Sequence, residues 1–170
     1  MSIVLVTGGS RSGKSRFAEG LVQAPKHYVA TAQAYDDEMT SRIKLHKDRR
    51  DHSWHNHETP YELVQTLREI DGWGNQILVD CLTIWLSNLL MAERDCEAEV
   101  SILVEHLATA KAKIVIVSNE VGMGIVPDNA LTRSFRDIQG MANQLVAAVA
   151  ESVVFTVAGI PMVIKGPWPK

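Results

Sequence analysis

The chain of 170 residues is long enough to form one domain with a buried core. Hydrophobic residues make up 46% and charged residues 22% of it, which is the ordinary globular range and excludes wholesale disorder. The net charge of −3, with both signs interspersed, excludes the electrostatic footprint of a duplex nucleic-acid binder.

Neither a secretory leader nor a membrane span is expected. The N-terminus has no charged n-region and begins with a strand-like run, and the longest apolar stretches are too short to cross a bilayer. Cys81 and Cys96 have no metal-ligand spacing and no disulfide framework, which fits a reducing compartment. These features predict a cytoplasmic protein whose residues 1–170 form a single domain.

Strand-like and helix-like segments alternate along the chain. Strands are expected over residues 2–6, 27–31, 76–79, 113–117, 153–157 and 161–164. Helices are expected over 14–22, 61–70, 82–91, 98–111 and 131–149, and a further one from the acidic turn 36–38 to the basic residues 47–50. The histidine-rich stretch 51–60 is expected to be a loop. This alternation predicts a mainly parallel sheet with helices on both faces, and a ligand beyond the carboxyl ends of the strands.

A glycine-rich phosphate-binding pattern follows the first strand. Gly8-Gly9-Ser10-Arg11-Ser12-Gly13-Lys14-Ser15 matches G-x-x-x-x-G-K-[ST] in full. The glycines let the backbone wrap around phosphate oxygens, and the helix beginning near Lys14 directs its positive end at the same anion. Lys14 is predicted to reach the terminal phosphates of ATP or GTP, and the Ser15 hydroxyl to coordinate Mg²⁺. The fold class predicted is therefore α/β, a P-loop NTPase-type domain.

Two carboxylates are expected at the same edge of the sheet. Asp80 ends the apolar run Ile77-Leu78-Val79, as the magnesium-holding aspartate of a P-loop enzyme does, although it could also cap the helix that begins near Leu82. We favour the metal role beside a P-loop. Glu120 follows the strand 113–117 and either acts on metal or substrate or orients the loop 121–127; the sequence does not decide between these.

His46 stands in a basic segment. On a helix, Arg42, His46 and Arg49 share one stripe, and the surrounding positive charges disfavour the imidazolium form. A neutral imidazole can attack phosphorus, and the same charges would stabilise a triphosphate. By spacing alone, a solvated basic face with an incidental histidine is the simpler interpretation. His52, His55 and His57 match no familiar zinc pattern and are expected to be polar loop residues.

Several further motifs are distinctive as a set. The most specific are Ser118-Asn119-Glu120-Val121-Gly122-Met123-Gly124-Ile125-Val126-Pro127 and Phe135-Arg136-Asp137-Ile138-Gln139-Gly140. Others are Tyr28-Val29-Ala30-Thr31-Ala32, Arg42-Ile43 with His46-Lys47, Asp80-Cys81-Leu82-Thr83 and Ala158-Gly159-Ile160-Pro161. On these motifs the chain closely resembles, over nearly its whole length, the bifunctional adenosylcobinamide kinase / adenosylcobinamide-phosphate guanylyltransferases of cobalamin biosynthesis.

The resemblance implies two reactions: phosphorylation of adenosylcobinamide with ATP or GTP, and transfer of GMP from GTP to adenosylcobinamide phosphate. It implies that His46 carries GMP as a covalent intermediate, so Lys14 and His46 are the expected catalytic residues. It also implies a homotrimer, whereas the expectation of no nucleic-acid partner and no membrane span comes from the charge and the apolar stretches described above. The guanine-nucleotide contacts it implies are Ala30, Thr31, Ala32, Lys47, Asp48, Arg49, Arg50, Glu58 and Asp80.

Two departures from the family pattern leave this interpretation standing. Some relatives have a second histidine just before the nucleophile, where this chain has Leu45, and residues 166–170 extend past the usual end and are assigned no role. Two alternatives stay open at this point. One is an enzyme that keeps only the guanylyltransferase step, and the other is a nucleotide-dependent binding protein.

Overall fold

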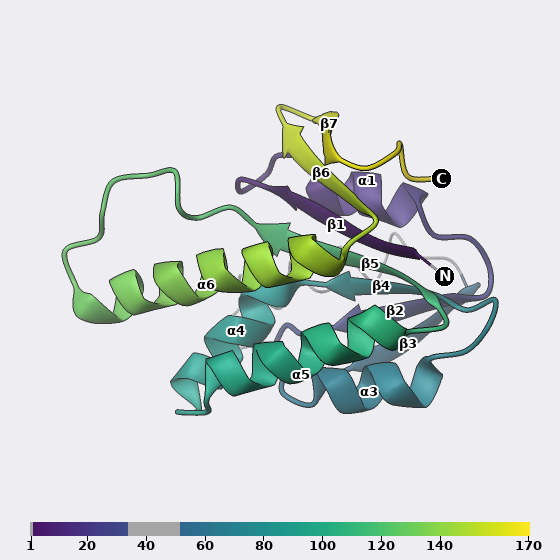
Figure 1. The fold of residues 1–170 in the computed structure, drawn as a ribbon, viewed down its shortest axis with the longest axis horizontal. Coiled ribbons are helices and arrows are strands. Elements are labelled where there is room, and N and C mark those ends of the chain that lie inside the picture. Colours follow the sequence, from purple (N-terminus) through teal and green to yellow (C-terminus); the bar gives the residue numbers. More distant parts are fainter. Residues whose placement is uncertain (1, 34–51) are drawn as a thin grey trace.

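The computed structural model describes residues 2–33 and 52–170, and within them it has the predicted α/β architecture (Figure 1). A sheet of seven strands has the order β3-β2-β4-β5-β1-β6-β7. All neighbours pair in parallel except β6 and β7, which form an antiparallel hairpin. The strands are β1 Ser2–Gly8, β2 Lys26–Ala30, β3 Trp54–Glu58, β4 Gln76–Asp80, β5 Lys113–Asn119, β6 Ser152–Val157 and β7 Ile160–Lys165.

Helices cover both faces of the sheet (Figure 1). They are α1 Lys14–Gly20, α3 Leu63–Ile70, α4 Leu82–Met91, α5 Cys96–Thr109 and α6 Ala130–Val149. Helix α1 lies on one face and the other four lie on the opposite face (Figure 1). None of the described helices is long and apolar enough to cross a membrane. The predicted helices over residues 14–22, 61–70, 82–91, 98–111 and 131–149 are confirmed to within two residues at each end.

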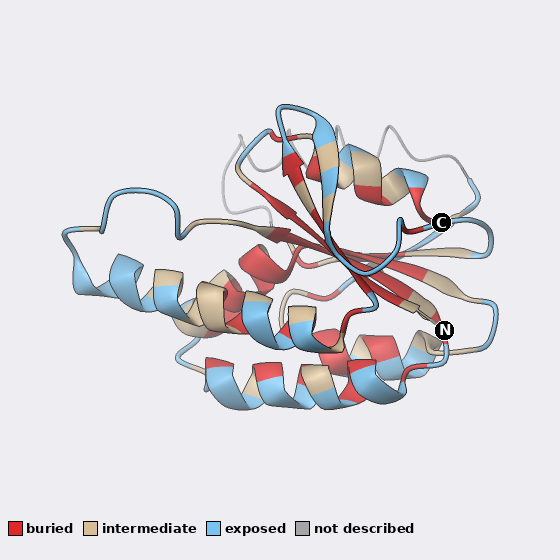
Figure 2. Ribbon diagram, turned by 45° about the horizontal axis from the view of Figure 1, so that its top comes forward, coloured by how far each residue is buried: buried red, intermediate tan, exposed pale blue. Residues whose placement is uncertain are grey.

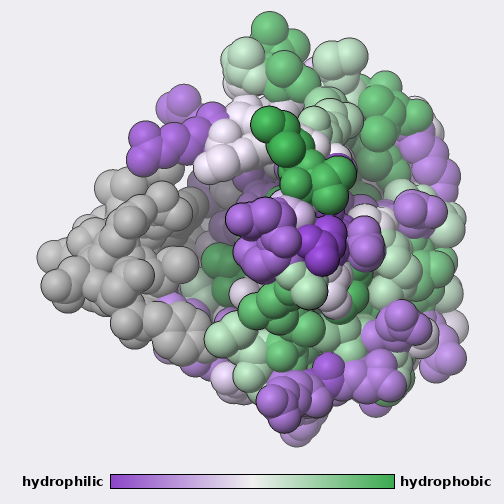
Figure 3. Space-filling model, turned by 90° about the vertical axis from the view of Figure 1, so that its left-hand side faces the viewer, coloured by the Kyte–Doolittle hydropathy of each residue, from purple (hydrophilic) through white to green (hydrophobic). Residues whose placement is uncertain are grey.

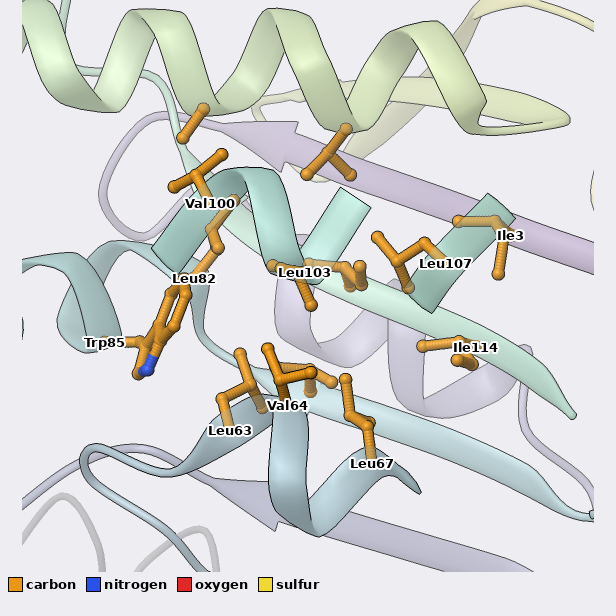
Figure 4. Close-up of a cluster of buried hydrophobic side chains, with 14 of the residues drawn as sticks. Ile3, Leu63, Val64, Leu67, Leu82, Trp85, Val100, Leu103, Leu107 and Ile114 are labelled. Carbon is orange, nitrogen blue, oxygen red and sulfur yellow. The ribbon is translucent and has the colours of Figure 1, made fainter. Parts of the chain in front are cut away.

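The central strands are buried on both faces (Figure 2). Alternate residues of β1 and β5 point to opposite sides: Val4 and Val6 pack toward α1, whereas Ile3 and Leu5 pack toward the helices on the other face. On that second face Trp85 of α4 is fully buried, and its indole nitrogen donates to the carbonyl of Tyr61 at 2.8 Å (Figure 4). This core fixes the order of the strands and so fixes which loops meet at their carboxyl ends.

The prediction of a loop over residues 51–60 is wrong, because Trp54–Glu58 form β3 at the edge of the sheet. Its pairing with β2 is parallel and runs from Lys26 opposite Trp54 to Ala30 opposite Glu58. As an edge strand, β3 buries no side chain fully, so its sequence shows no apolar alternation. The helix predicted between residues 36 and 50 falls outside the described residues.

Strand β3 brings three histidines together on one face of the sheet. His27 of β2 lies opposite His55, and His57 lies two residues further along the same face. The His27 Nδ1 and His57 Nε2 atoms are 3.1 Å apart, a hydrogen bond that requires one ring to donate and the other to accept. The rings of His55 and His57 both stack on His27, with centroids 5.2 Å and 5.3 Å away. We call these three residues the histidine cluster.

The histidine cluster is expected to make stability fall in mild acid. Burial lowers the pKa of His27 and of His57 from 6.5, and the neighbouring histidines lower both further, whereas Glu69 of α3 opposes the shift at His57. Below about pH 6.5 the unfolded chain therefore binds more protons than the folded chain. The free energy of unfolding decreases as the pH is lowered, until the pH lies below the pKa values of the folded protein. The loss of stability is measured as the difference between the urea midpoints at pH 7.5 and pH 5.5, and His57→Gln should make that difference smaller. Equal differences in both proteins would contradict it.

The last residues of the chain, to which the sequence assigns no role, pack against α1. The Trp168 ring meets Phe17 edge-on with centroids 5.9 Å apart, and Ser152 Oγ donates to the carbonyl of Pro167 at 2.7 Å. This segment therefore covers one side of the helix that begins at the phosphate-binding loop.

Candidate active site

The phosphate-binding loop lies between β1 and α1, as predicted. Gly13 precedes the helix with φ +93°, in the left-handed region that favours glycine. A side chain on Gly8 would come within 2.5 Å of the carbonyl oxygen of Thr156, and one on Gly13 within 3.1 Å of Gly159 Cα. The Gly159 amide, in the β6–β7 turn, donates to the carbonyl of Ser12 at 2.9 Å. The hairpin thus supports the loop from behind, and glycine is needed where the two backbones meet.

Gly13→Ala is expected to destabilise the loop. The substitution puts a Cβ at a positive φ and against the Gly159 backbone, which costs about 1–3 kcal/mol. The free energy of unfolding measured in urea gives the value, and a nucleotide titration should show weaker binding. Gly20→Ala, at the end of α1 with open space around its Cβ, is the matched control and should not destabilise the protein. A Gly13→Ala protein as stable as the control would contradict the role given to this glycine.

Lys14 sits at the start of α1 with its side chain only 9% exposed. Its Nζ donates to the carbonyl of Gly9 at 3.0 Å, so the ammonium folds back over its own loop. Burial lowers the pKa of Lys14, while the neighbouring Cys81 and Asp80 oppose that shift. A desolvated ammonium enclosed by loop backbone is suited to a phosphate group.

The interior of the loop contains polar groups without partners. The hydroxyls of Thr7, Ser12 and Thr156 are buried and find no hydrogen-bond partner among the described residues. Such groups are costly unless something satisfies them. Ser12 belongs to the loop and Thr156 is paired with Gly8, at which the loop begins, so an anion bound in the loop would be close to both hydroxyls.

Three residues implied by the resemblance lie in one row. Asp80, Ala30 and Glu58 pair across the ends of β4, β2 and β3, so each occupies the same level at the carboxyl edge of the sheet. The amide of Thr31 donates to the Asp80 carbonyl at 3.2 Å, and that of Thr59 to the Ala30 carbonyl at 2.8 Å, which locks the row. The strand register therefore brings together residues that are up to 50 positions apart in the sequence.

Thr31 differs from its neighbours because its side chain already has partners. It is fully buried, its hydroxyl donates to the Cys81 carbonyl at 2.8 Å, and it accepts from the Cys81 amide at 2.9 Å. Asn88 of α4 donates to the Thr31 carbonyl at 2.8 Å. The Thr31 side chain therefore ties β2 to the start of α4, and Ala32, which follows it, is partly exposed.

Asp80 does not cap α4. The N-cap position is occupied by Cys81, and no side chain there makes a capping bond. Instead, Asp80 Oδ2 accepts from the Tyr28 hydroxyl at 2.9 Å. A carboxylate oriented by Tyr28 near Lys14, with the partly exposed Ser15 hydroxyl, is an oxygen-only set that fits Mg²⁺. The site therefore has residues suited to this ion.

Glu120 follows β5 and bonds to the loop beside it. Its amide donates to the Gly8 carbonyl at 3.0 Å, and its Oε1 accepts from the Gly122 amide. These bonds support the interpretation in which Glu120 orients the loop 121–127. Arg136 of α6 donates to the carbonyls of Gly122 and Ile125 and holds the same loop from the other side.

The face of the molecule at which the strands end carries apolar side chains beside hydrophilic ones (Figure 3).

A buried amide network behind β5 was not foreseen from the sequence. Gln139 of α6 is 1% exposed and donates to Ser118 Oγ at 2.9 Å, and Ser118 Oγ donates to Asn143 Oδ1 at 2.6 Å. Asn143 Nδ2 donates to the Asn119 carbonyl at 3.1 Å. The network fixes the end of β5 next to the phosphate-binding loop. Its only signal in the sequence is a pair of amide side chains four residues apart on an otherwise amphipathic helix.

A hollow of about 570 Å³ lies beyond Glu58, between the start of α3 and the turn after α4. Among the described residues its wall includes Glu58, Glu62 and Glu69 and one cation, Arg94. Arg94 pairs with Glu62 at 2.6 Å. The described wall is mainly negatively charged and would repel phosphate groups, so the glycine-rich loop is the better position for the phosphates of a nucleotide.

Of the predicted site, the structure brings together the loop residues Gly8 to Ser15, the residues Ala30 to Ala32, and Glu58 and Asp80. The remaining predicted residues lie outside the part of the chain that the structure describes: His46, Lys47, Asp48, Arg49 and Arg50.

The sheet order and the glycine-rich loop define the class of protein: an α/β protein of the P-loop NTPase type. Solved structures agree at the level of the fold alone. A protein from Pyrococcus horikoshii OT3 has a TM-score of 0.56 at 11% identity, covering 98% of this chain and 87% of that one. The flagellar accessory protein FlaH from Methanocaldococcus jannaschii has a TM-score of 0.54 at 14% identity, covering 97% and 78%.

The chain belongs to the cobinamide kinase / cobinamide phosphate guanyltransferase family, whose profile matches residues 4–164. It is 45% identical over 167 residues to the bifunctional adenosylcobalamin biosynthesis protein CobP of Pseudomonas aeruginosa, covering 95% of this chain and 96% of that protein. It is 44% identical to the protein CobU of Salmonella typhimurium, covering 96% and 99%. The CobU protein of Escherichia coli is 39% identical over similar shares. The chain is therefore a transferase of cobalamin biosynthesis.

Proposed function

We propose that this chain phosphorylates adenosylcobinamide with ATP or GTP and then transfers GMP from GTP to adenosylcobinamide phosphate. The family supplies the two reactions. The observations that support the assignment to named residues are the burial of Lys14 over the phosphate-binding loop and the position of Asp80, which accepts from Tyr28, at the edge where β4, β2 and β3 end. Phosphoryl and nucleotidyl transfer need charge neutralisation and in-line placement, and this edge offers both.

Each described residue has one task in this proposal. The loop from Gly8 to Ser15 binds the phosphates through backbone amides, and Lys14 neutralises charge on the terminal phosphates. Ser15 and Asp80 would hold Mg²⁺, which supplies further neutralisation when bound. Tyr28 keeps one oxygen of Asp80 in a fixed direction. The proposal assigns Ala30, Thr31, Ala32 and Glu58 to contacts with the guanine nucleotide.

His46 is the proposed nucleophile of the second reaction. One imidazole nitrogen attacks the α-phosphorus of GTP, the bond to the β-phosphate oxygen breaks, and pyrophosphate leaves with its electron pair. A phosphate oxygen of adenosylcobinamide phosphate then attacks the same phosphorus, releases the imidazole and forms adenosylcobinamide-GDP. Lys47, Asp48, Arg49 and Arg50 follow the nucleophile in sequence, and the proposal assigns them to contacts with the bound GTP.

The experiment uses adenosylcobinamide with each nucleotide in turn. ATP with Mg²⁺ should give adenosylcobinamide phosphate, and subsequent addition of GTP should give adenosylcobinamide-GDP and pyrophosphate, both resolved by chromatography and mass spectrometry. If the protein converts chemically prepared adenosylcobinamide phosphate but not adenosylcobinamide, it is a guanylyltransferase without kinase activity. No turnover of either corrinoid would contradict the proposal and favour a nucleotide-dependent binding protein.

We also propose that the protein is a homotrimer, as the family resemblance implies, and that it is cytoplasmic, as predicted from its N-terminal sequence and short apolar stretches. The described chain leaves apolar side chains exposed on the β6–β7 hairpin: Val157, Ile160, Met162 and Ile164 are 47–65% exposed. Apolar residues gathered on an edge strand are suited to burial against another subunit. Light scattering coupled to gel filtration measures the mass, and a monomer at micromolar concentration would contradict a trimer.

A further inference from the structure

The histidine cluster lies at the edge of the sheet next to the row of Asp80, Ala30 and Glu58, because His57 directly precedes Glu58 in β3. It consists of His27 near the start of β2 and His55 and His57 in β3. His55 is exposed, whereas His27 and His57 are half-buried. Neither of the two proposed reactions uses these residues, so the cluster needs an account of its own.

The spacing of the two closest nitrogens suits a shared metal ion. Zinc binds imidazole nitrogen at about 2.0–2.1 Å, so two such ligands lie about 2.9 Å apart at a right angle and about 3.3 Å apart at a tetrahedral angle. His27 Nδ1 and His57 Nε2 are 3.1 Å apart, between these limits. The separation therefore already suits shared ligation, and the two rings would need to turn so that both nitrogens point at the ion in place of the shared proton.

The chemistry of the cluster selects the class of ion. Neutral imidazole is the form that binds metals, and burial lowers the pKa of His27 and His57, which keeps both neutral at pH 7. Nitrogen ligands suit Zn²⁺, Ni²⁺ and Cu²⁺ and not the hard cation Mg²⁺. Glu69 of α3 faces His57 and contributes a nearby negative charge.

We propose that His27 and His57, with His55 beside them, form a binding site for a divalent transition-metal ion. In the described part of the chain no three such side chains are already arranged around one point. His55 supplies the third ligand by turning its exposed ring, which stacks on His27 at 5.2 Å, and water completes the coordination. A bound ion would join β2 to the edge strand β3, whose one partner among the described strands is β2.

The test uses the full chain, stripped with EDTA and free of nucleotide. Zn²⁺ titrated calorimetrically at pH 7.5 should bind with one ion per chain, should resist competition by excess Mg²⁺, and should raise the thermal midpoint by about 2–4 °C or more. Binding should weaken at pH 5.5, where protons compete. Cu²⁺ in the same protein should show splitting from at least two imidazole nitrogens in its electron paramagnetic resonance spectrum.

Variants locate the ion. His57→Gln should weaken Zn²⁺ binding at least tenfold, and His55→Gln, at an exposed position that folding does not need, should weaken it less. The matched control is His52→Gln, which removes a histidine from the turn before β3 and should bind like the unchanged protein. Absence of saturable binding, unchanged affinity in His57→Gln and His55→Gln, or a copper spectrum without imidazole nitrogens would each overturn the proposal. The reactions at the phosphate-binding loop do not enter these measurements.

Discussion

Lys14→Ala is expected to lower kcat/KM for both phosphoryl and guanylyl transfer by at least ~10²-fold. Lys14 is the buried cation at the end of the phosphate-binding loop, and a preorganised charge of this kind contributes most where developing negative charge is shielded from water. Both reactions begin from a triphosphate held in one loop, so one substitution should impair both.

The fold should survive this change. Burial lowers the pKa of Lys14, so the folded protein already bears a cost for keeping that ammonium charged, and its removal should leave the urea midpoint close to that of the unchanged chain. Arg16→Ala, which removes an exposed cation from the same helix, is the matched control and should keep both activities. Steady-state rates of the Lys14→Ala protein within a few-fold of the control would contradict the role of Lys14.

His46→Ala is expected to abolish guanylylation of the protein. Incubated with Mg²⁺ and GTP labelled at the α-phosphorus, the unchanged chain should acquire a covalent label that survives alkali and is lost in acid, as a phosphoramidate is. The variant has no nucleophile to form that bond and should stay unlabelled. Phosphorylation of adenosylcobinamide by ATP should continue, because that transfer goes directly from nucleotide to substrate hydroxyl.

The two results together separate binding from chemistry. His52→Ala serves as the control histidine and should label normally. If the His46→Ala protein labels as well as the unchanged chain, another residue carries the nucleotide. If it loses the kinase step as well, His46 contributes to nucleotide binding for both reactions, and the assignment as a dedicated nucleophile is wrong.

The sequence predicts those parts of the fold that depend on patterns among residues close together in the chain. The loop from Gly8 to Ser15 is predicted by the residue spacing within a stretch of eight residues. Strands β1 and β5 are predicted because each is a short apolar run bounded by turn residues, and the structure confirms both strands. Strand β3 was missed because its sequence, Trp-His-Asn-His-Glu, carries no apolar alternation. What makes it a strand is the hydrogen bonding of its backbone to β2, which no local pattern records.

The candidate site shows the same division. Asp80 was identified because it ends an apolar strand, but its orientation by Tyr28 depends on a residue 52 positions away. The support of β5 by Gln139 and Asn143 likewise joins residues over 20 positions apart, and each alone resembles a surface amide. The histidine cluster depends on the register of two strands, since His27 is separated from His57 by 30 residues.

The turn of the β6–β7 hairpin has a mechanical consequence. Because the Gly159 amide donates to the Ser12 carbonyl, and Gly13 has no room for a side chain against Gly159, the turn of the hairpin and the phosphate-binding loop are in direct backbone contact. Strand β7 is the last described strand at the opposite end of the sheet from the histidines. In the proposed trimer, a subunit contact on β7 would therefore lie on the hairpin whose turn supports the phosphate-binding loop.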